Sequence, residues 1–591
     1  MRAALALLFL AMLGFDPPRA QTPAAGGADA NPLAETGPGN RYFPPAFLLR
    51  SAAIAPRAMA ATSHPLATQV ALDVLRRGGN AFDAAVAANA AIGVLEPTGN
   101  GIGGDLFAIV WSAEDGRLHG LNASGRAPRA VTLDRVRADL GVDAGEVDEI
   151  STRHPHSITV PGAVSGWFAL HDRFGSVPMA DLLAPAVAYA RDGAPVPQYI
   201  AALWARSTSL AEQPGFAETF LPGGRAPREG ERFRNPALAR TLERIAEGGA
   251  AAFYEGEIAA EVEAFCGRAG CHLTAEDFAA HEADWVDPVG VTYRGHTLWE
   301  LPPNGQGIAA LQMLQMLQPY DLRAMGHNSA AYLHHLVEAK KIAYEDRARY
   351  YADPAFAEAP VDRLISAEYA DRRRALLDPD RASTALDPGD PRAGRGGTIY
   401  LAVGDEAGNM VSLIQSNYAG FGTGYVPDGL GFSLQNRGAG FSLEPGHPNA
   451  YAPGKRPFHT IIPGFVTRDG RPHMAFGVMG GDMQPQGHVQ VFLNHVVFGM
   501  NPQEAGDAAR FRHIGSTSPA GLLRPMADGG CVALESGVGG AVRDRLAAMG
   551  HGLCDEDWTH YGGYQAVMWD AEEEVYWGAT ESRVDGQAAG F

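Results

Sequence analysis

The chain has 591 residues, of which 46% are hydrophobic and 19% are charged, so it can bury a large core and is not a disordered protein. Its formal net charge of −20, with no basic block anywhere, disfavours nucleic acid or an anionic membrane surface as its partner.

The first twenty residues have the pattern of a signal peptide. Arg2 gives a positive start, residues 3–15 form a short apolar stretch, and Ala20 offers a cleavage position. Residues 21–40, rich in Ala, Pro and Gly, are expected to be a flexible N-terminus. The pattern predicts a periplasmic or secreted protein without a membrane partner after signal removal. The alternative is an uncleaved membrane anchor.

Residues 65–95 predict two helices separated by Gly78–Gly79. The second, FDAAVAANAAIGVL, is almost wholly small and apolar, which predicts burial on all sides. A glycine-rich turn (98–105) and a strand-like run, LFAIVW, follow. Residues 160–390 are mostly helical by pattern, and 334–351 predict one amphipathic helix.

From Thr398 onward the pattern changes to strands. TIYLAV, MVSLIQS, HTIIPGFV and MAFGVM are separated by Gly, Asp, Asn and Pro. CVALES, the helix-like GAVRDRLAAMGHG, YQAVMWD and EVYWGA complete the chain. Without repeats or long linkers, these elements indicate one large unit that combines helices and strands.

The four cysteines fit an oxidising compartment. Cys266 and Cys271 are five residues apart, and Cys531 and Cys554 flank the helix-like stretch, so two disulfides between sequence neighbours are plausible. Four buried thiols are the alternative. The nineteen histidines include no HExxH or similar spacing, so we expect no metal site and no cofactor.

The segment 394–417 carries the first candidate for catalysis. Two alternating strands surround the hairpin loop DEAGN, and symmetry about Ala407 places residues whose numbers sum to 814 opposite one another. Thr398 would then face Ser416, with the two hydroxyls within contact distance. Glycines precede Thr398, and glycine tolerates the strained backbone that attack on the Gly397–Thr398 bond requires.

Cleavage at that bond would make Thr398 an N-terminal residue that carries both a nucleophile and a base. Its α-amine, with an ordinary pKa of about 7.7–8.0, can accept the hydroxyl proton near neutral pH. A plain turn before a strand is the structural alternative. Gly480–Gly481, after a further strand, can direct backbone N–H groups toward a developing oxyanion, although a simple glycine turn has the same spacing.

Over nearly the whole mature chain, the sequence resembles the gamma-glutamyltranspeptidase (glutathione hydrolase) family of N-terminal nucleophile hydrolases. The segments that carry the resemblance are 75–97, 101–110, 273–307, 338–354, 398–409, 421–426, 452–463 and 477–488. The resemblance implies an α+β fold with a four-layer αββα sandwich. It also implies self-cleavage into a large subunit (41–397, after the flexible 21–40) and a small subunit (398–591) that remain together.

The family's catalytic pattern maps onto four residues of this chain. The resemblance implies that Thr398 is the nucleophile, that Ser416 assists it, and that Gly480 and Gly481 form the oxyanion hole. Its partners would be a small-molecule amide substrate and either water or an amine as acceptor.

The family's glutamate pocket is only partly present. The arginine for the α-carboxylate falls on Ser124, with Arg126 two residues on, and the acid for the α-amine falls on Gly440. The resemblance places the other pocket positions at Tyr418, Asn436, Arg437, His459 and Thr460. Because a buried ammonium without an acid is costly, γ-glutamyl recognition is doubtful, and the cationic residues suit a dicarboxylic half-amide.

Alternatives remain for the pocket and for the whole chain. Arg437 could instead pair with a structural acid such as Glu444. The pattern resembles the branch of oxamate amidohydrolase-like and cephalosporin acylase-like proteins more than the glutathione enzymes. From other classes, a catalytically inactive periplasmic binding protein or a metal-dependent hydrolase would be the alternative.

Overall fold

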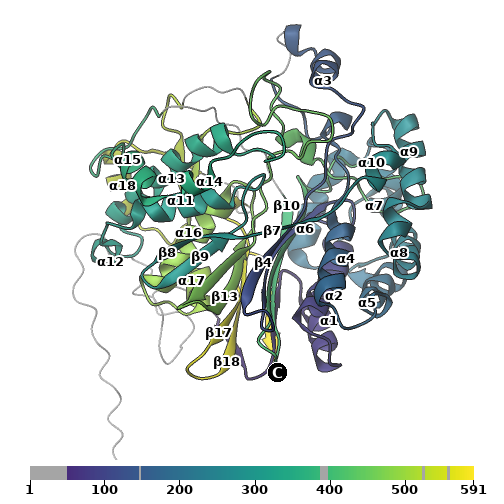
Figure 1. Cartoon of the computed structure of the whole chain (residues 1–591), viewed down its shortest axis with the longest axis horizontal. Coiled ribbons are helices and arrows are strands. Elements are labelled where there is room, and N and C mark those ends of the chain that lie inside the picture. Colours follow the sequence, from purple (N-terminus) through teal and green to yellow (C-terminus); the bar gives the residue numbers. More distant parts are fainter. Residues whose placement is uncertain (1–49, 145–147, 387–396, 522–525, 556–559) are drawn as a thin grey trace, which may run out of the picture.

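In the computed structural model, the described residues are 50–144, 148–386, 397–521, 526–555 and 560–591 (Figure 1). The predicted signal peptide and the flexible extension up to residue 40 lie outside these ranges. Within them, no helix is both long and apolar enough to cross a membrane.

Two seven-stranded sheets form the centre of the molecule, and neighbouring strands in both are antiparallel. The first sheet runs in the order β19 (Gln587–Gly590), β2 (Met59–Thr62), β10 (Gly397–Gly404), β11 (Met410–Tyr418), β3 (Asp105–Ser112), β4 (Arg117–Ala123) and β7 (Asp284–Val286). The second runs β1 (Ala53–Ala55), β18 (Val575–Thr580), β17 (Tyr564–Asp570), β13 (Arg471–Val478), β12 (Gly464–Arg468), β9 (His296–Glu300) and β8 (Val289–Tyr293).

Strand β10 shows how the core is divided between the two faces of the first sheet. Ile399, Leu401 and Val403 belong to the apolar cluster shared with the helices, whereas Tyr400 and Ala402 belong to the cluster shared with the second sheet. This alternation follows from the two-residue period of a strand. Both faces of β10 are therefore buried, which holds the start of the strand in a fixed position.

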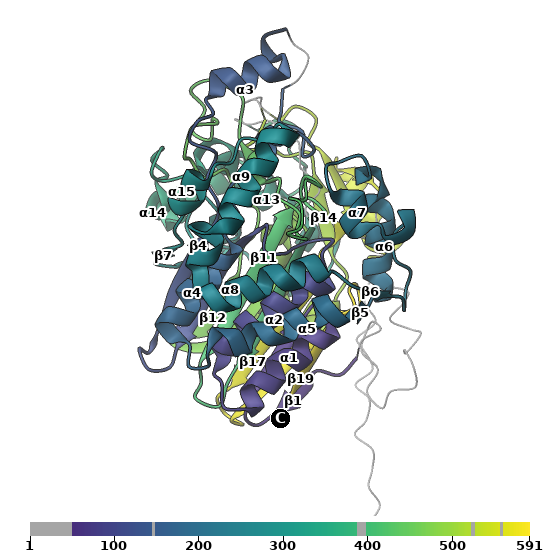
Figure 2. The same cartoon turned by 90° about the vertical axis from the view of Figure 1, so that its right-hand side faces the viewer.

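Helices cover the outer face of the first sheet (Figures 1 and 2). They include α1 (Pro65–Arg76), α2 (Ala81–Leu95), α4 (Ala163–Phe174), α5 (Met179–Asp192), α8 (Pro236–Tyr254) and α9 (Glu257–Ala269). The two helices predicted over 65–95 are confirmed. All but one residue of α2 are buried, as its composition indicates, and Asn80 begins it with a capping box.

The second sheet is covered by α11 (Gly307–Leu317), α13 (Ala330–Tyr350), α16 (Met483–Val496) and α17 (Pro502–Asp507) (Figure 1). The prediction that 334–351 is an amphipathic helix is wrong in one respect, because every residue of α13 from Tyr332 to Ala348 is buried. Its charged groups find partners inside the protein: Lys341 Nζ lies 2.8 Å from Glu338 Oε1, and Arg347 Nη1 lies 2.6 Å from Asp482 Oδ1.

The remaining elements are short or lie at the periphery. They are α3 (Leu133–Leu140), α6 (Gln198–Arg206), α7 (Phe216–Phe220), α10 (Ala275–Ala279), α12 (Leu322–Met325), α14 (Val361–Leu364), α15 (Ala367–Arg374), β5 (Ala194–Pro195) and β6 (Arg232–Phe233). The strand predicted over 459–466 is shorter than expected, since only Gly464–Arg468 forms β12. Before it, His459 forms only an isolated parallel bridge with Gly305, and the Ile462 N–H donates to the Gln484 side chain, so this stretch does not join the second sheet.

Both predicted disulfides are present, with Cα–Cα distances of 4.4 Å for Cys266–Cys271 and 5.8 Å for Cys531–Cys554. The second joins β15 (Cys531–Leu534) to β16 (Gly552–Cys554), which with β14 (Phe511–Ile514) form a small sheet, and α18 (Gly540–Ala548) lies between the two cysteines in the chain.

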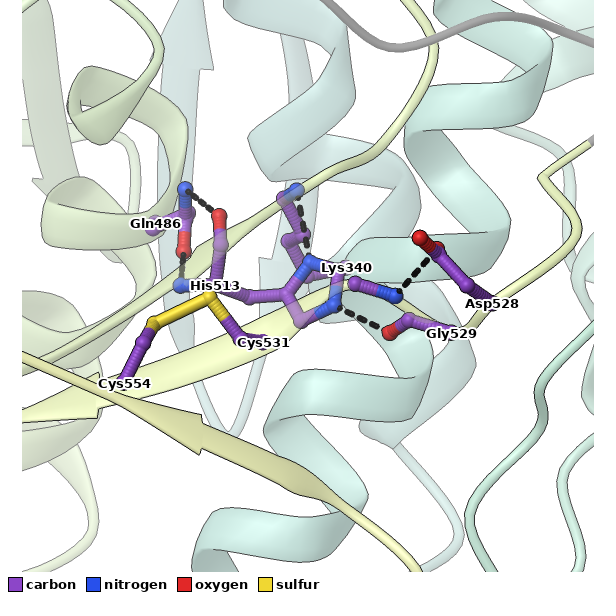
Figure 3. The surroundings of a disulfide bond; sticks show 8 residues. Lys340, Gln486, His513, Asp528, Gly529, Cys531 and Cys554 are labelled. Atoms are coloured by element: carbon purple, nitrogen blue, oxygen red, sulfur yellow. Dashed lines mark hydrogen bonds between the residues drawn. A yellow bond between two sulfur atoms is a disulfide. The ribbon is translucent and has the colours of Figure 1, made fainter.

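Beside this disulfide lies the buried Lys340 of α13 (Figure 3). Because His513 Nε2 donates to the Gly529 carbonyl at 2.9 Å, its Nδ1 accepts from Lys340 Nζ at 3.0 Å. Burial lowers the pKa of Lys340 well below its usual value. The small sheet is thus attached to α13 by a buried polar contact as well as by apolar packing.

Candidate active site

Thr398 lies at the start of β10, where the strand register changes. The predicted pairing of residues whose numbers sum to 814 holds from Ile399–Gln415 to Gly404–Met410. A bulge then places Gly397 opposite Tyr418. Despite the bulge, the Thr398 hydroxyl donates to Ser416 Oγ at 3.3 Å. The two hydroxyls that the sequence places on opposing strands therefore meet.

Ser416 is fully buried, and its oxygen also accepts the N–H of Tyr418 at 2.8 Å. Tyr418 has a positive φ of 78°, a conformation that is uncommon for a residue with a side chain. The backbone turns sharply at this residue and directs its N–H back at the serine. This turn holds the Ser416 hydroxyl in place beside Thr398.

A cavity of about 470 Å³ opens in front of Thr398, and Gly480 is part of its wall. The other lining residues come from loops and helices distant in sequence: Glu96, Thr98, Gly99, Thr152, Arg153, Tyr199, Leu203, Arg206, Ser207, Ala419, Gly420, Met479, His560, Gly562, Gly563 and Val584. The cavity is therefore large enough for a small acyl amide.

Gly480 and Gly481 form the turn between β13 and α16, with φ values of 113° and 61° that favour glycine. Among the residues that the structure describes, no protein acceptor receives the N–H of either glycine. Both lie at the N-terminal end of α16, where the helix dipole favours a negative charge. The turn can thus supply N–H donors to an anion formed beside Thr398.

A buried hydrogen-bond chain supports this glycine turn. Gln306 Nε2 donates to the Gly481 carbonyl at 2.9 Å, and Arg347 Nη1 donates to Gln306 Oε1 at 2.7 Å. Arg347 also bonds Asp482, the residue that follows the glycines. Sequence reasoning missed both Gln306 and Arg347, because neither belongs to a local motif near the glycines.

Arg437 is buried close to this site and has few partners. Its Nη1 donates to Thr460 Oγ1 at 2.8 Å, and its guanidinium lies 4.3 Å from the centre of the Tyr418 ring. Nε and Nη2 have no hydrogen-bond partner within the described ranges. The acid that acts electrostatically on the Arg437 guanidinium is Asp105. The alternative pairing of Arg437 with Glu444 is not observed.

Asp105 and His459 form the polar layer behind Ser416. Asp105 lies opposite Ser416 across β3 and β11, and its Oδ2 lies 3.0 Å from His459 Nε2. Burial raises the pKa of Asp105 to about 6, although Arg437 opposes this shift, and burial also lowers the pKa of His459 well below its usual value. Burial lowers the pKa of Arg437 to about 10, so the guanidinium remains charged at neutral pH.

Two other predicted pocket residues have different surroundings. Asn436 supports the cavity wall, since its Oδ1 accepts the Ala419 N–H at 3.0 Å and its Nδ2 donates to the Thr152 carbonyl at 3.0 Å. Like Tyr418, Arg437, His459 and Thr460, Arg126 is not among the residues that line the cavity. It contacts Asp353, Asp284 and the Gly454 carbonyl instead.

The structure also shows what stands at the two positions where the family's pocket residues are missing. Ser124 Oγ donates to Asn122 Oδ1 at 2.7 Å, so it belongs to a buried amide network. A Cβ at Gly440 would lie 2.7 Å from the Phe458 carbonyl oxygen, which leaves no room for a side chain there without a backbone shift. The fold therefore leaves no room at Gly440 for the acid that the resemblance would place there.

Several cavity residues were not foreseen from the sequence: Glu96, Arg153, Arg206 and His560. Burial raises the pKa of Glu96 to about 8, and the Ser63 hydroxyl donates to its Oε1 at 2.7 Å. Arg153 Nη1 donates to the Gly422 carbonyl at 3.2 Å. Only the fold brings these four residues to the cavity, and no spacing in the chain indicates it.

Comparison with known proteins identifies the family. The family model for gamma-glutamyltranspeptidase matches residues 67–591. The glutathione hydrolase-like YwrD proenzyme of Bacillus subtilis is 38% identical over 77% of this chain and 85% of its own length. The oxamate amidohydrolase proenzyme of Klebsiella pneumoniae is 36% identical over 92% of this chain and 100% of its own length.

The solved structure of cephalosporin acylase from Bacillus halodurans superposes with a TM-score of 0.83 at 41% identity, covering 94% of this chain and 99% of that one. The expected resemblance, including its acylase and oxamate amidohydrolase relatives, is thereby confirmed. The chain belongs to the gamma-glutamyltranspeptidase family.

Proposed function

We propose that this chain is a proenzyme that cleaves itself before Thr398 and then uses Thr398 as the nucleophile of an amidohydrolase or acyltransferase. The observation that carries the proposal is the position of Thr398. Its hydroxyl lies 3.3 Å from Ser416 Oγ, and the residue lines a cavity together with Gly480. The two sheets with helices outside them support the four-layer αββα sandwich of N-terminal nucleophile hydrolases.

In the maturation step, Thr398 Oγ1 attacks the carbonyl carbon of Gly397, the C–N bond breaks, and the proton moves to the departing nitrogen. The resulting ester is hydrolysed by water, which leaves a carboxylate on Gly397 and a free α-amine on Thr398. Ser416 accepts the hydrogen bond of the attacking hydroxyl and so orients it. The products are the proposed large subunit (41–397, with whatever remains of 21–40) and the small subunit (398–591).

In the mature enzyme, the Thr398 α-amine takes the hydroxyl proton as Oγ1 attacks the acyl carbon of the amide substrate. The N–H groups of Gly480 and Gly481 stabilise the oxyanion. The amine product leaves with the proton, and water or a second amine then releases the acyl group from Thr398. No step requires a metal or an organic cofactor.

For the substrate, two acyl classes remain: γ-glutamyl compounds and dicarboxylic half-amides without an α-amine. The second is favoured by Arg437, because its two unpartnered N–H-bearing nitrogens suit a carboxylate. The lack of space for an acid at Gly440 supports the same class. Gly397 lies opposite Tyr418, so its release on cleavage would uncover Tyr418 and the Arg437 behind it.

The first experiment determines the intact mass of purified wild-type, Thr398→Ala and Thr398→Ser protein under denaturing conditions. We expect wild type to give two fragments that meet at 397/398, Thr398→Ala to stay whole and inactive, and Thr398→Ser to be cleaved more slowly. Cleavage of Thr398→Ala at the same bond would show that a host protease cuts the chain. A wild-type chain that never splits would favour the inactive binding protein.

The same masses locate the mature N-terminus. We propose that the signal peptide is removed after Ala20 and that the protein is periplasmic or secreted. Substrate class is then determined with a panel of amides: glutathione and γ-glutamyl-p-nitroanilide against oxamate, succinamate and glutaryl amides. Preference for the amides without an α-amine is expected. Preference for glutathione would contradict the role assigned to Arg437 and would show that the substrate is a γ-glutamyl compound.

A further inference from the structure

Three histidines meet at the end of the second sheet that lies away from Thr398. His296 begins β9, His473 lies near the start of β13, and His495 lies in the last turn of α16. One potential ligand atom from each ring lies within 4.8 Å of the others. They are separated by 177 and 22 positions in the chain (473 − 296 and 495 − 473), so no sequence motif announces them.

The hydrogen bonds of these rings determine which nitrogens face one another. His495 Nδ1 lies 2.8 Å from the Met500 carbonyl and His296 Nδ1 lies 3.3 Å from the Arg294 carbonyl. Because a carbonyl only accepts, both Nδ1 atoms carry hydrogen, and in a neutral ring Nε2 then carries the lone pair. Metal-ligating histidines are commonly oriented by this kind of Nδ1–H bond to a carbonyl.

The third ring completes the arrangement. His473 Nε2 lies 2.8 Å from His495 Nε2, and the His473 ring also has a hydrogen-bonding contact with the Trp569 backbone.

We propose that His296, His473 and His495 form a binding site for a divalent transition metal, with zinc as the ion that three imidazole nitrogens best suit. Zinc–nitrogen bonds of about 2.0–2.1 Å in a tetrahedral site place the nitrogens roughly 3.3 Å apart. The His473–His495 pair needs to open by only about half an ångström to reach this spacing. A water molecule would take the fourth position, since the described residues supply three ligands.

The site would tie β9, β13 and α16 together. β13 and α16 are joined by the Gly480–Gly481 turn, so the histidines and the glycines lie at opposite ends of the same strand–helix pair. Since α16 rises about 1.5 Å per residue over its 14 residues, the two ends are roughly 20 Å apart. The metal therefore has a structural role and takes no part in the proposed acyl transfer.

Two other groups of potential ligands fit a metal less well. In the group of His334, Glu338 and His551, the glutamate is already bonded to Lys341 Nζ at 2.8 Å and to the Ser383 N–H at 3.0 Å. Both of its carboxylate oxygens are thus occupied by donors of the protein.

In the group of Asp139, His156 and His272, the aspartate accepts from Arg135 Nε at 2.6 Å. The two imidazoles stack with centroids 4.7 Å apart and an interplanar angle of 24°, so their faces meet where a metal needs ring edges. In the cluster on β9, β13 and α16, by contrast, the ring nitrogens bond backbone carbonyls and one another, although the guanidinium of Arg468, opposite His296 across β9 and β12, acts electrostatically on all three rings.

The test uses the full protein without a histidine tag, treated with chelator and then titrated with Zn²⁺ or Co²⁺. We expect one equivalent to bind, visible absorption bands for the Co²⁺ form, and a Tm that rises with zinc concentration by mass action. His473→Ala and His296→Ala should abolish all three effects. His171→Gln, a partly buried histidine on α4, should change none.

Before the titration, each alanine variant must have the same Tm as the wild type in chelator. This control shows that lost metal binding is not caused by loss of the fold. Absence of stoichiometric binding by the wild type would overturn the proposal. Binding that survives in a folded His296→Ala and His473→Ala would overturn it as well. So would binding lost in His551→Ala instead, which would assign the metal to the other buried group.

Discussion

Arg347 and Arg437 are both almost completely buried, at 1% exposure, yet their surroundings differ. Arg347 bonds Gln306, Asp482 and the Thr517 carbonyl, and leaves only Nε without a partner. Arg437 makes one hydrogen bond, to Thr460, and leaves Nε and Nη2 without partners.

A buried guanidinium with a full set of partners stabilises the fold around it, whereas one with unused donors is costly to keep. The comparison separates a residue that holds the glycine turn from one that keeps unused donors, which we propose bind the acyl carboxylate. Both residues lie near the candidate active site, so proximity alone does not assign their roles.

The largest effect is expected for Arg347→Met, which leaves Asp482 and Gln306 without their charged partner. We expect a loss of about 3–5 kcal/mol in the free energy of unfolding, measured by urea denaturation. Arg349→Met, at an exposed position of the same helix, is the matched control and should cost less than about 0.5 kcal/mol. Equal losses in the two variants would show that the partners of Arg347 contribute nothing specific.

Arg437→Met is expected to leave the fold almost unchanged and to impair turnover. Removing an incompletely paired buried charge should alter the free energy of unfolding by less than about 1 kcal/mol or raise it. For an anionic half-amide, kcat/KM should fall about 100-fold, while an uncharged acyl amide is affected little.

Arg126→Met is the control for Arg437, since Arg126 is paired with Asp353 and Asp284. Arg126→Met should leave the ratio of kcat/KM for the anionic half-amide to kcat/KM for the uncharged amide unchanged. If Arg126→Met alters this ratio and Arg437→Met does not, Arg126 and not Arg437 binds the acyl carboxylate. The contrast between the two buried arginines would then have no functional meaning.

The smallest effect concerns Glu96, a buried acid on the cavity wall whose Oε1 accepts from the Ser63 hydroxyl. Burial raises the pKa of Glu96 from 4.5 to about 8, against the opposing bond from Ser63. Between these values the folded protein keeps a proton that the unfolded chain has lost, so stability falls as the pH rises through this window.

Glu96→Gln mimics the protonated acid and should be as stable as wild type at pH 5 but about 1–2 kcal/mol more stable at pH 8. The measurement is urea denaturation at both pH values. Exposed Glu114→Gln should show no such difference between them. If Glu96→Gln gains the same stability at both pH values, the protonation of Glu96 is not the cause of the gain.

Much of the local structure could be predicted because it depends on neighbours in the chain. The hairpin register of β10 and β11 follows from alternation and loop length, and it is confirmed from Ile399 onward. The bulge at Thr398 was not predictable, since it depends on the turn at Tyr418 and on packing against β3. Helices α1 and α2 were predicted for the same local reasons, through periodicity and the Gly78–Gly79 stop.

Helix α13 shows where such reasoning fails. Its charged residues suggest a solvent-facing side, but Arg347 and Glu345 find partners, Asp482 and Thr517, in segments more than 130 residues away. A charge pattern alone does not reveal whether a charged side chain has a buried partner.

The sequence by itself determined the family and the meeting of Thr398 with Ser416, and it favoured the two disulfides between near neighbours over free thiols, because each depends on short spacing or on motifs along the chain. Only the tertiary structure decided which buried arginine has unused donors, which residues line the cavity, and that three distant histidines converge. Those features depend on contacts between elements far apart in the chain, and the energy of a buried polar group is set by the partners that the fold brings to it.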